Sequence, residues 1–75
     1  MRNLYDVINQ IVEVAPDLEE NLNSIRESVM YSAPENMGMW WNMTAEILNE
    51  YALDHPKADK IAAIFSGKEV GVTLS

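Results

Sequence analysis

The chain has 75 residues, room for one small domain, and 48% of them are hydrophobic, as in ordinary globular proteins. Twelve acidic residues against five basic ones give a formal net charge of −7. This charge argues against direct binding of nucleic acid or of an anionic membrane, because phosphate contacts need a basic face. The sequence has no cysteine, which excludes disulfides, zinc–thiolate sites, iron–sulfur clusters and thiol nucleophiles.

The first residues do not have the pattern of a signal peptide. Asp6, Asn9 and Gln10 interrupt the apolar residues and leave a helical stripe in place of a continuous apolar segment. The longest apolar runs elsewhere are about five residues, whereas a membrane span needs about twenty. We therefore expect a cytoplasmic protein with no membrane segment.

Residues 4–14 have the clearest helical periodicity in the chain. Their apolar side chains fall on one half of a helical cylinder and their polar side chains on the other. Asn3 is suited to cap this helix, and Asp6 lies in the first turn, where the helix dipole favours an acid. The following Ala15-Pro16 pair predicts a break, because the residue before a proline is disfavoured in the helical region.

A second helix is predicted from Pro16, with acids crowded at its positive end. Its apolar residues lie at spacings of four, three and four, and they form a stripe only about 60° wide: Leu18, Leu22, Ile25 and Val29. Such a narrow stripe resembles a coiled-coil seam. Most of this helix is expected to face water or a partner.

A third helix is predicted from about Pro34 to Leu53, or from a later start after Gly38. Ser32 and Glu35 have the spacing of a capping box before it. Asp54 is expected to cap a fourth helix, which ends at Gly67.

These elements predict an all-α fold, a small compact bundle of four short helices, with a three-helix core as the alternative. The single helical domain is expected over residues 1–67. Residues 68–75 are expected to form an irregular or short extended C-terminal tail.

Few residues suggest chemistry. His55, with Asp54 beside it and Asp59 four residues on, could start a metal half-site or an acid–base pair, but no nucleophile or oxyanion donor accompanies it. A solvated turn is the simpler interpretation. Glu46 and Glu50 have the spacing of carboxylates in bundle metal sites, but the Glu-x-x-His motifs of such sites are absent. We predict no catalytic residue, metal or cofactor.

The surface pattern is more informative. Met39 and Met43 fall on the outer side of the third helix beside Glu46 and Glu50, and Tyr31 points away from the apolar stripe of the second helix. Exposed methionines between acids suit an adaptable protein contact. Further acids lie along the outer side of the second helix: Asp17, Glu20 and Glu27. Such a row either attracts a basic surface or only keeps the domain soluble.

The leading hypothesis is a non-enzymatic acidic protein that binds another protein. It would act as an inhibitor or adaptor covering a basic or nucleic-acid-binding surface, as accessory proteins of phages and mobile elements do. The alternative is a homodimeric assembly protein that pairs the stripe of the second helix across a two-fold axis. A small metal-dependent enzyme using His55 is a distant third hypothesis.

Overall fold

A computed structural model describes residues 3–67, which form an all-α bundle as the sequence predicts. Its helices are α1 (Leu4–Val14), α2 (Glu19–Met30), α3 (Met37–Tyr51) and α4 (Ala58–Ser66), and 3-10 turns at Pro16–Leu18 and Pro34–Asn36 lead into α2 and α3. The predicted tail over residues 68–75 lies outside the described residues.

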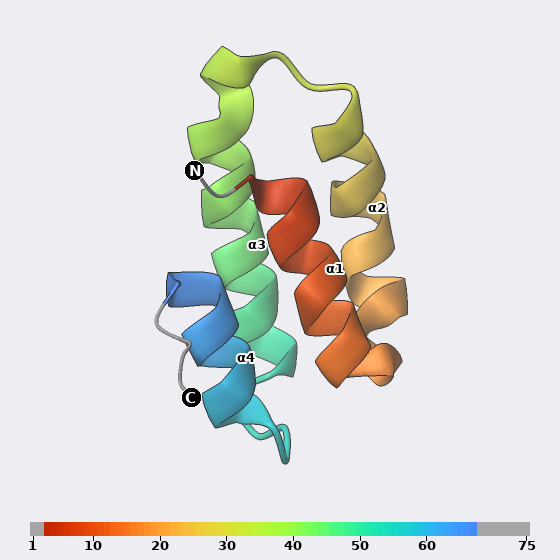
Figure 1. The fold of residues 1–75 in the computed structure, drawn as a ribbon, viewed down its shortest axis with the longest axis vertical. Helices are drawn as coiled ribbons and strands as arrows, with labels where there is room; N and C mark the ends of the chain where they lie inside the picture. Colours follow the sequence, from red (N-terminus) through yellow and green to blue (C-terminus); the bar gives the residue numbers. More distant parts are fainter. Residues whose placement is uncertain (1–2, 68–75) are drawn as a thin grey trace.

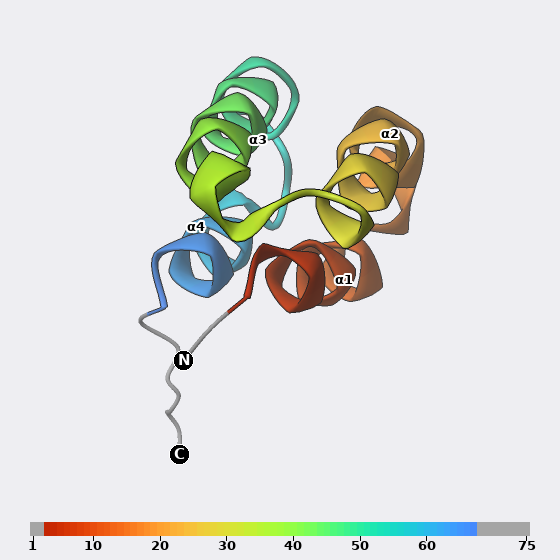
Figure 2. The ribbon, with the colours of Figure 1, turned by 90° about the horizontal axis from the view of Figure 1, so that it is seen from above.

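The four helices form two layers (Figures 1 and 2). Helices α2 and α3 lie side by side in one layer, and α1 and α4 lie against them in the other. Consecutive helices run in opposite directions, as short connections require. Helix α4 covers only the lower part of α3 in Figure 1, because α4 has nine residues and α3 has fifteen.

Helix α1 forms for the local reasons that the sequence indicates. The Oδ1 of Asn3 accepts the backbone N–H of Asp6 at 2.9 Å and caps the helix. The helix ends at Ala15, which precedes Pro16 and leaves the helical conformation (φ −133°, ψ 76°). Both predicted ends of this helix are confirmed.

The core lies between the two layers and draws mainly on α1 and α2. Because α1 packs against both α2 and α4, it supplies the largest share of fully buried side chains. Buried apolar side chains come from every helix: Leu4, Val7, Ile8 and Ile11 of α1, Leu22, Ile25 and Val29 of α2, Leu48 of α3, and Ile61 and Ile64 of α4.

The apolar stripe of the second helix belongs to this core. Leu18, Leu22, Ile25 and Val29 are all buried within one copy of the chain. This burial argues against the hypothesis that the stripe pairs two copies across a two-fold axis, since such pairing would require the core to open. The half-buried Arg26 and Ser28 flank the stripe.

The start of the third helix differs from both predicted starts. A 3-10 turn at Pro34–Asn36 precedes α3, which begins at Met37 and includes Gly38. The predicted capping box is wrong, because no side chain caps either element. The hydroxyl of Ser32 instead accepts the indole N–H of Trp40 at 2.9 Å. Trp40 and Trp41 are half-buried against the core, whereas Tyr51 in the last turn of α3 is exposed.

The connection between α3 and α4 is longer than predicted. Asp54 caps no helix, and α4 begins at Ala58, preceded by Lys57. The other end of α4 follows the prediction, because Gly67 adopts a left-handed conformation (φ 82°). Its N–H bonds to the carbonyls of Ala63 at 2.9 Å and Ile64 at 3.3 Å, as in a glycine C-cap.

Candidate interaction surface

The outward side of α3 carries a continuous row of methionines and glutamates. Thr44 and Leu48 are buried, so the opposite side of this helix faces away from the core. At about 100° per residue, spacings of four, three and four keep a row on one side of a helix. Four of the predicted interaction residues form this exposed row: Met39, Met43, Glu46 and Glu50. The methionines are 50% and 41% exposed.

The neighbouring helix α2 adds acids and an aromatic ring. Its Arg26 reaches α1, whereas Glu20 and Glu27 lie opposite the buried stripe and are exposed. Tyr31, which directly follows α2, is 84% exposed. Because α2 packs beside α3, these residues and the α3 row belong to one layer of the bundle. We call the seven residues the acidic–methionine face: Glu20, Glu27, Tyr31, Met39, Met43, Glu46 and Glu50.

The charges of this face are not neutralised by the bundle. Residues 3–67 hold eleven acids, all but Glu69, and three bases, all but Arg2 and Lys68. Within this range the acids in ion pairs are Glu19 and Asp17. The glutamates of the acidic–methionine face form no ion pair with a described residue, so their carboxylates remain available to a partner.

Asp17 does not belong with them, although the sequence places it in the same acidic row. It lies in the 3-10 turn before α2, where both of its carboxylate oxygens are 3.1 Å from Nε2 of His55. The hydrogen bond from His55 lowers the pKa of Asp17, and a backbone hydrogen bond and the nearby charge of Lys57 lower it further. Asp17 is therefore engaged within the chain.

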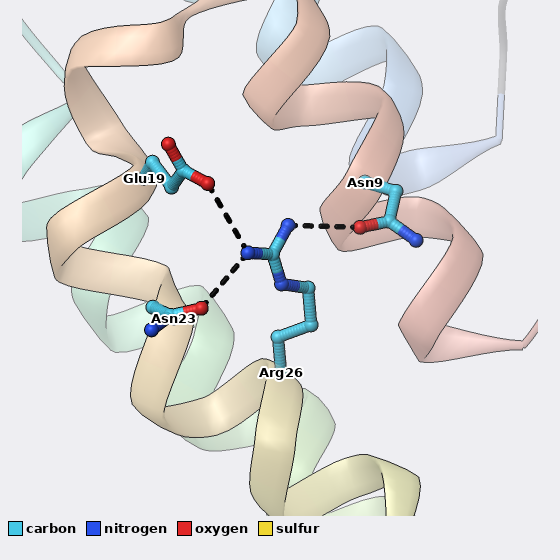
Figure 3. A network of polar contacts seen from close by, with 4 residues as sticks. All are labelled: Asn9, Glu19, Asn23 and Arg26. Carbon is cyan, nitrogen blue, oxygen red and sulfur yellow. Dashed lines mark hydrogen bonds and ion pairs between the residues drawn. The ribbon is translucent and has the colours of Figure 1, made fainter.

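Arg26 pairs with Glu19, the other described acid in an ion pair, and bonds to two asparagines (Figure 3). Its guanidinium donates to Oδ1 of Asn9 at 2.9 Å and to Oδ1 of Asn23 at 2.8 Å, and it lies 3.3 Å from Oε2 of Glu19. The Arg26 side chain is only 18% exposed. This network joins α1 to α2. The one sequence signal for it is a lone base on a helix rich in acids and asparagines.

His55 occupies a structural position. Its Nδ1 accepts the backbone N–H of Lys57 at 3.0 Å, so the neutral ring carries its proton on Nε2 and donates it to Asp17. Neither Asp54 nor Asp59 is its partner, whereas the alternative of a metal half-site or acid–base pair would require one of them. Within residues 3–67, no three His, Asp or Glu side chains gather closely enough to hold a metal ion. No helix of that range could cross a membrane.

A second apolar surface, not foreseen from the sequence, lies between α3 and α4. It is a groove of about 470 Å³ lined by Leu48, Ala52, Ile61 and Phe65, with Leu53 71% exposed at its border. Sequence periodicity did not find it, because the separation of two neighbouring helices depends on how each packs on the rest of the bundle.

No protein-family model matches the chain, and no match was found among the curated proteins or the solved structures.

Proposed function

We propose that this chain is a non-enzymatic interaction protein that binds a basic surface of another protein through the acidic–methionine face. The observation that carries the proposal is the exposure of Met39 and Met43 in one row with Glu46 and Glu50, whose carboxylates form no ion pair with a described residue. A charged surface that serves solubility alone has no need of two exposed methionines beside it.

The side chains support a division of roles within this face. Methionine is flexible and polarizable, so Met39 and Met43 can adapt to the apolar groups of a partner and supply buried area. The carboxylates of α2 and α3 would steer a positively charged partner and speed association. Tyr31 adds a rigid amphipathic ring, a side chain often found at the centre of interfaces.

The charge of the chain favours a basic partner over a second copy. Two copies at −7 each repel one another, and the acidic–methionine face contains no base. A partner that presents Lys or Arg around an apolar centre complements both features of the face. A nucleic-acid-binding surface is one source of such chemistry, and an inhibitor that covers it would compete with the nucleic acid.

The test is a selection of peptides from a displayed random library on the full-length chain. We expect the selected peptides to be enriched in Lys and Arg together with Leu, Met or aromatic residues. Substituting Met39→Ser and Met43→Ser together should weaken their binding at least tenfold, because interface energy is concentrated in a few apolar contacts. Glu46→Gln with Glu50→Gln should weaken binding mainly at low salt.

Gln10→Ser is the matched control, since Gln10 is exposed on α1 in the opposite layer. Its affinities should equal those of the unchanged chain. Selected peptides without an excess of basic residues, or peptides that bind the Met39/Met43 double variant with full affinity, would exclude the proposed function.

A further inference from the structure

A hollow of about 600 Å³ lies over the start of α1, and none of its described lining residues belongs to the acidic–methionine face. Figure 1 shows that α1 begins below the upper ends of α2 and α3 and that the α2–α3 connection passes above it. Its lining includes Tyr5 of α1, Met30 of α2, and Met37 and Trp41 of α3.

The hollow follows from the unequal lengths of the helices. Helix α4 ends at Ser66, where Phe65 packs edge-on against Trp41 with ring centroids 5.3 Å apart. Within residues 3–67, no helical turn follows Ser66 to cover the first turn of α3, and Met37 and Trp41 are half-buried. Met30 at the end of α2 is 51% exposed.

This hollow lies on the opposite side of α3 from Met39 and Met43, whereas Tyr31 of the acidic–methionine face is the chain neighbour of the lining residues Met30 and Ser32. Met37 and Trp41 are four residues apart and share one side of α3. Met39 is two residues from Met37, about 200° around the helix, and therefore points to the opposite side. The two surfaces present different methionines, which allows them to be observed separately.

Two of the polar side chains that line the hollow, those of Asn3 and Ser32, are already hydrogen-bonded within the chain. Asn3 accepts the N–H of Asp6 and donates to the Asp6 carboxylate at 3.3 Å. Ser32 accepts from Trp40 and donates to the carbonyl of Ala33 at 3.2 Å. A polar ligand would find few hydrogen-bond partners here, so the lining suits an apolar group.

Among residues 3–67, two acids adjoin residues that line the hollow. The carboxylate of Asp6 contacts the lining residue Asn3, and the exposed Glu35 follows Pro34, which also lines the hollow. No Lys or Arg of residues 3–67 belongs to the lining. A second copy of the chain would bring a net charge of −7 against these acids, whereas a basic segment would be attracted to them.

We propose that this hollow is a binding site for one large apolar side chain, aromatic or aliphatic, carried on a basic segment of a protein partner. The apolar group packs against Met30, Met37 and Trp41. A neighbouring Lys or Arg of the partner pairs with Asp6 or Glu35. This site is separate from the acidic–methionine face, and it gives the chain a second point of attachment.

The test uses the full-length chain with ¹³C-labelled methionine methyl groups and three blocked tripeptides as probes: Lys-Phe-Lys, Lys-Ser-Lys and Glu-Phe-Glu. We expect Lys-Phe-Lys to shift the methyl signals of Met30 and Met37 in a saturable manner. The other two peptides should bind at least tenfold more weakly, because one lacks the apolar group and the other carries the wrong charge.

Met30→Gln should weaken the binding of Lys-Phe-Lys at least fivefold. Because Met30 is exposed, the variant should keep the fold, and the methyl signals of the other methionines check this directly. Met39→Gln is the matched control and should leave binding unchanged. No saturable shift at Met30 and Met37, or equal binding of the serine peptide, would overturn the proposal. Shifts confined to Met39 and Met43 would also overturn it, while supporting the proposed function.

Discussion

His55 and Asp17 are 38 residues apart in the sequence, yet Nε2 of His55 lies 3.1 Å from both carboxylate oxygens of Asp17. Nδ1 of the same ring accepts the N–H of Lys57. The imidazole therefore fastens the α3–α4 connection to the turn between α1 and α2. This contact holds together two connections that periodicity places only approximately.

The contact predicts how stability depends on pH. The pKa of Asp17 lies below its ordinary value of 3.8, chiefly because of the hydrogen bond from His55. A depressed pKa means that the stabilising effect is fully present above the unfolded pKa and is lost as pH falls through the folded pKa. Asp17→Asn should therefore melt at a lower temperature than the unchanged chain at pH 7, and the difference should shrink below about pH 4.

Thermal unfolding followed by circular dichroism from pH 7 to pH 2.5 measures this difference. Glu46→Gln is the matched control, since Glu46 lies in the middle of α3, is exposed and has no ion-pair partner among the described residues. This variant should have the same melting temperature as the unchanged chain at every pH. Equal melting temperatures for Asp17→Asn and the unchanged chain at pH 7 would show that the contact contributes nothing to stability.

The Arg26 network predicts a larger effect on stability. Arg26→Met keeps much of the apolar stem but loses the hydrogen bonds to Asn9 and Asn23 and the ion pair with Glu19. We expect the free energy of unfolding to fall by about 1–2 kcal/mol, a typical loss for partly buried hydrogen bonds to a charged group. Urea denaturation measures it. Lys60→Met, at an exposed position, should change stability by less than about 0.5 kcal/mol.

The two described glycines should respond to alanine in opposite directions. Gly38 lies in the first turn of α3, and a Cβ added there meets nothing within 4 Å, so Gly38→Ala should stabilise the fold by about 0.5 kcal/mol. Gly67 has φ 82°, so Gly67→Ala should destabilise it by about 1 kcal/mol. Urea denaturation of both variants checks the pair. A destabilising Gly38→Ala would contradict the helical assignment at this residue.

The burial of the α2 stripe predicts that it stabilises the core of a single copy and does not hold two copies together. Leu22 is fully buried, so Leu22→Ala should cost about 2–5 kcal/mol of stability. If the stripe serves one copy of the chain, the melting temperature should not depend on protein concentration, for the variant or for the unchanged chain. Light scattering behind size exclusion should report a monomer at low and high salt. A dimer that survives high salt would contradict this assignment.

Local signals in the sequence account for much of the fold. The cap at Asn3, the break at Ala15-Pro16 and the C-cap at Gly67 depend on residues within a few positions, and all three are confirmed. The exposure of Met39, Met43 and Tyr31 follows from helical periodicity and is also confirmed.

Contacts between distant segments could not be predicted in this way. Arg26 of α2 bonds to Asn9 of α1, and His55 bonds to Asp17, which is 38 residues away in the sequence. The capping-box pattern at Ser32 failed because a tertiary partner, the indole of Trp40, takes up its hydroxyl. Tyr51 lies on the same side of α3 as the buried Thr44 and Leu48, but it is in the last turn of the helix and is exposed.

The most direct test of the account is to map where a basic partner touches the chain. The full-length ¹⁵N-labelled protein is titrated with a synthetic amphipathic helix that carries leucines along one side and lysines on both borders, and with a version in which glutamates replace the lysines. We predict that the lysine helix alone shifts backbone amide signals, and that the shifts centre on Met39, Met43, Glu46, Glu50 and Tyr31. Equal shifts from the glutamate helix, or shifts that leave α2 and α3 unaffected, would contradict the account.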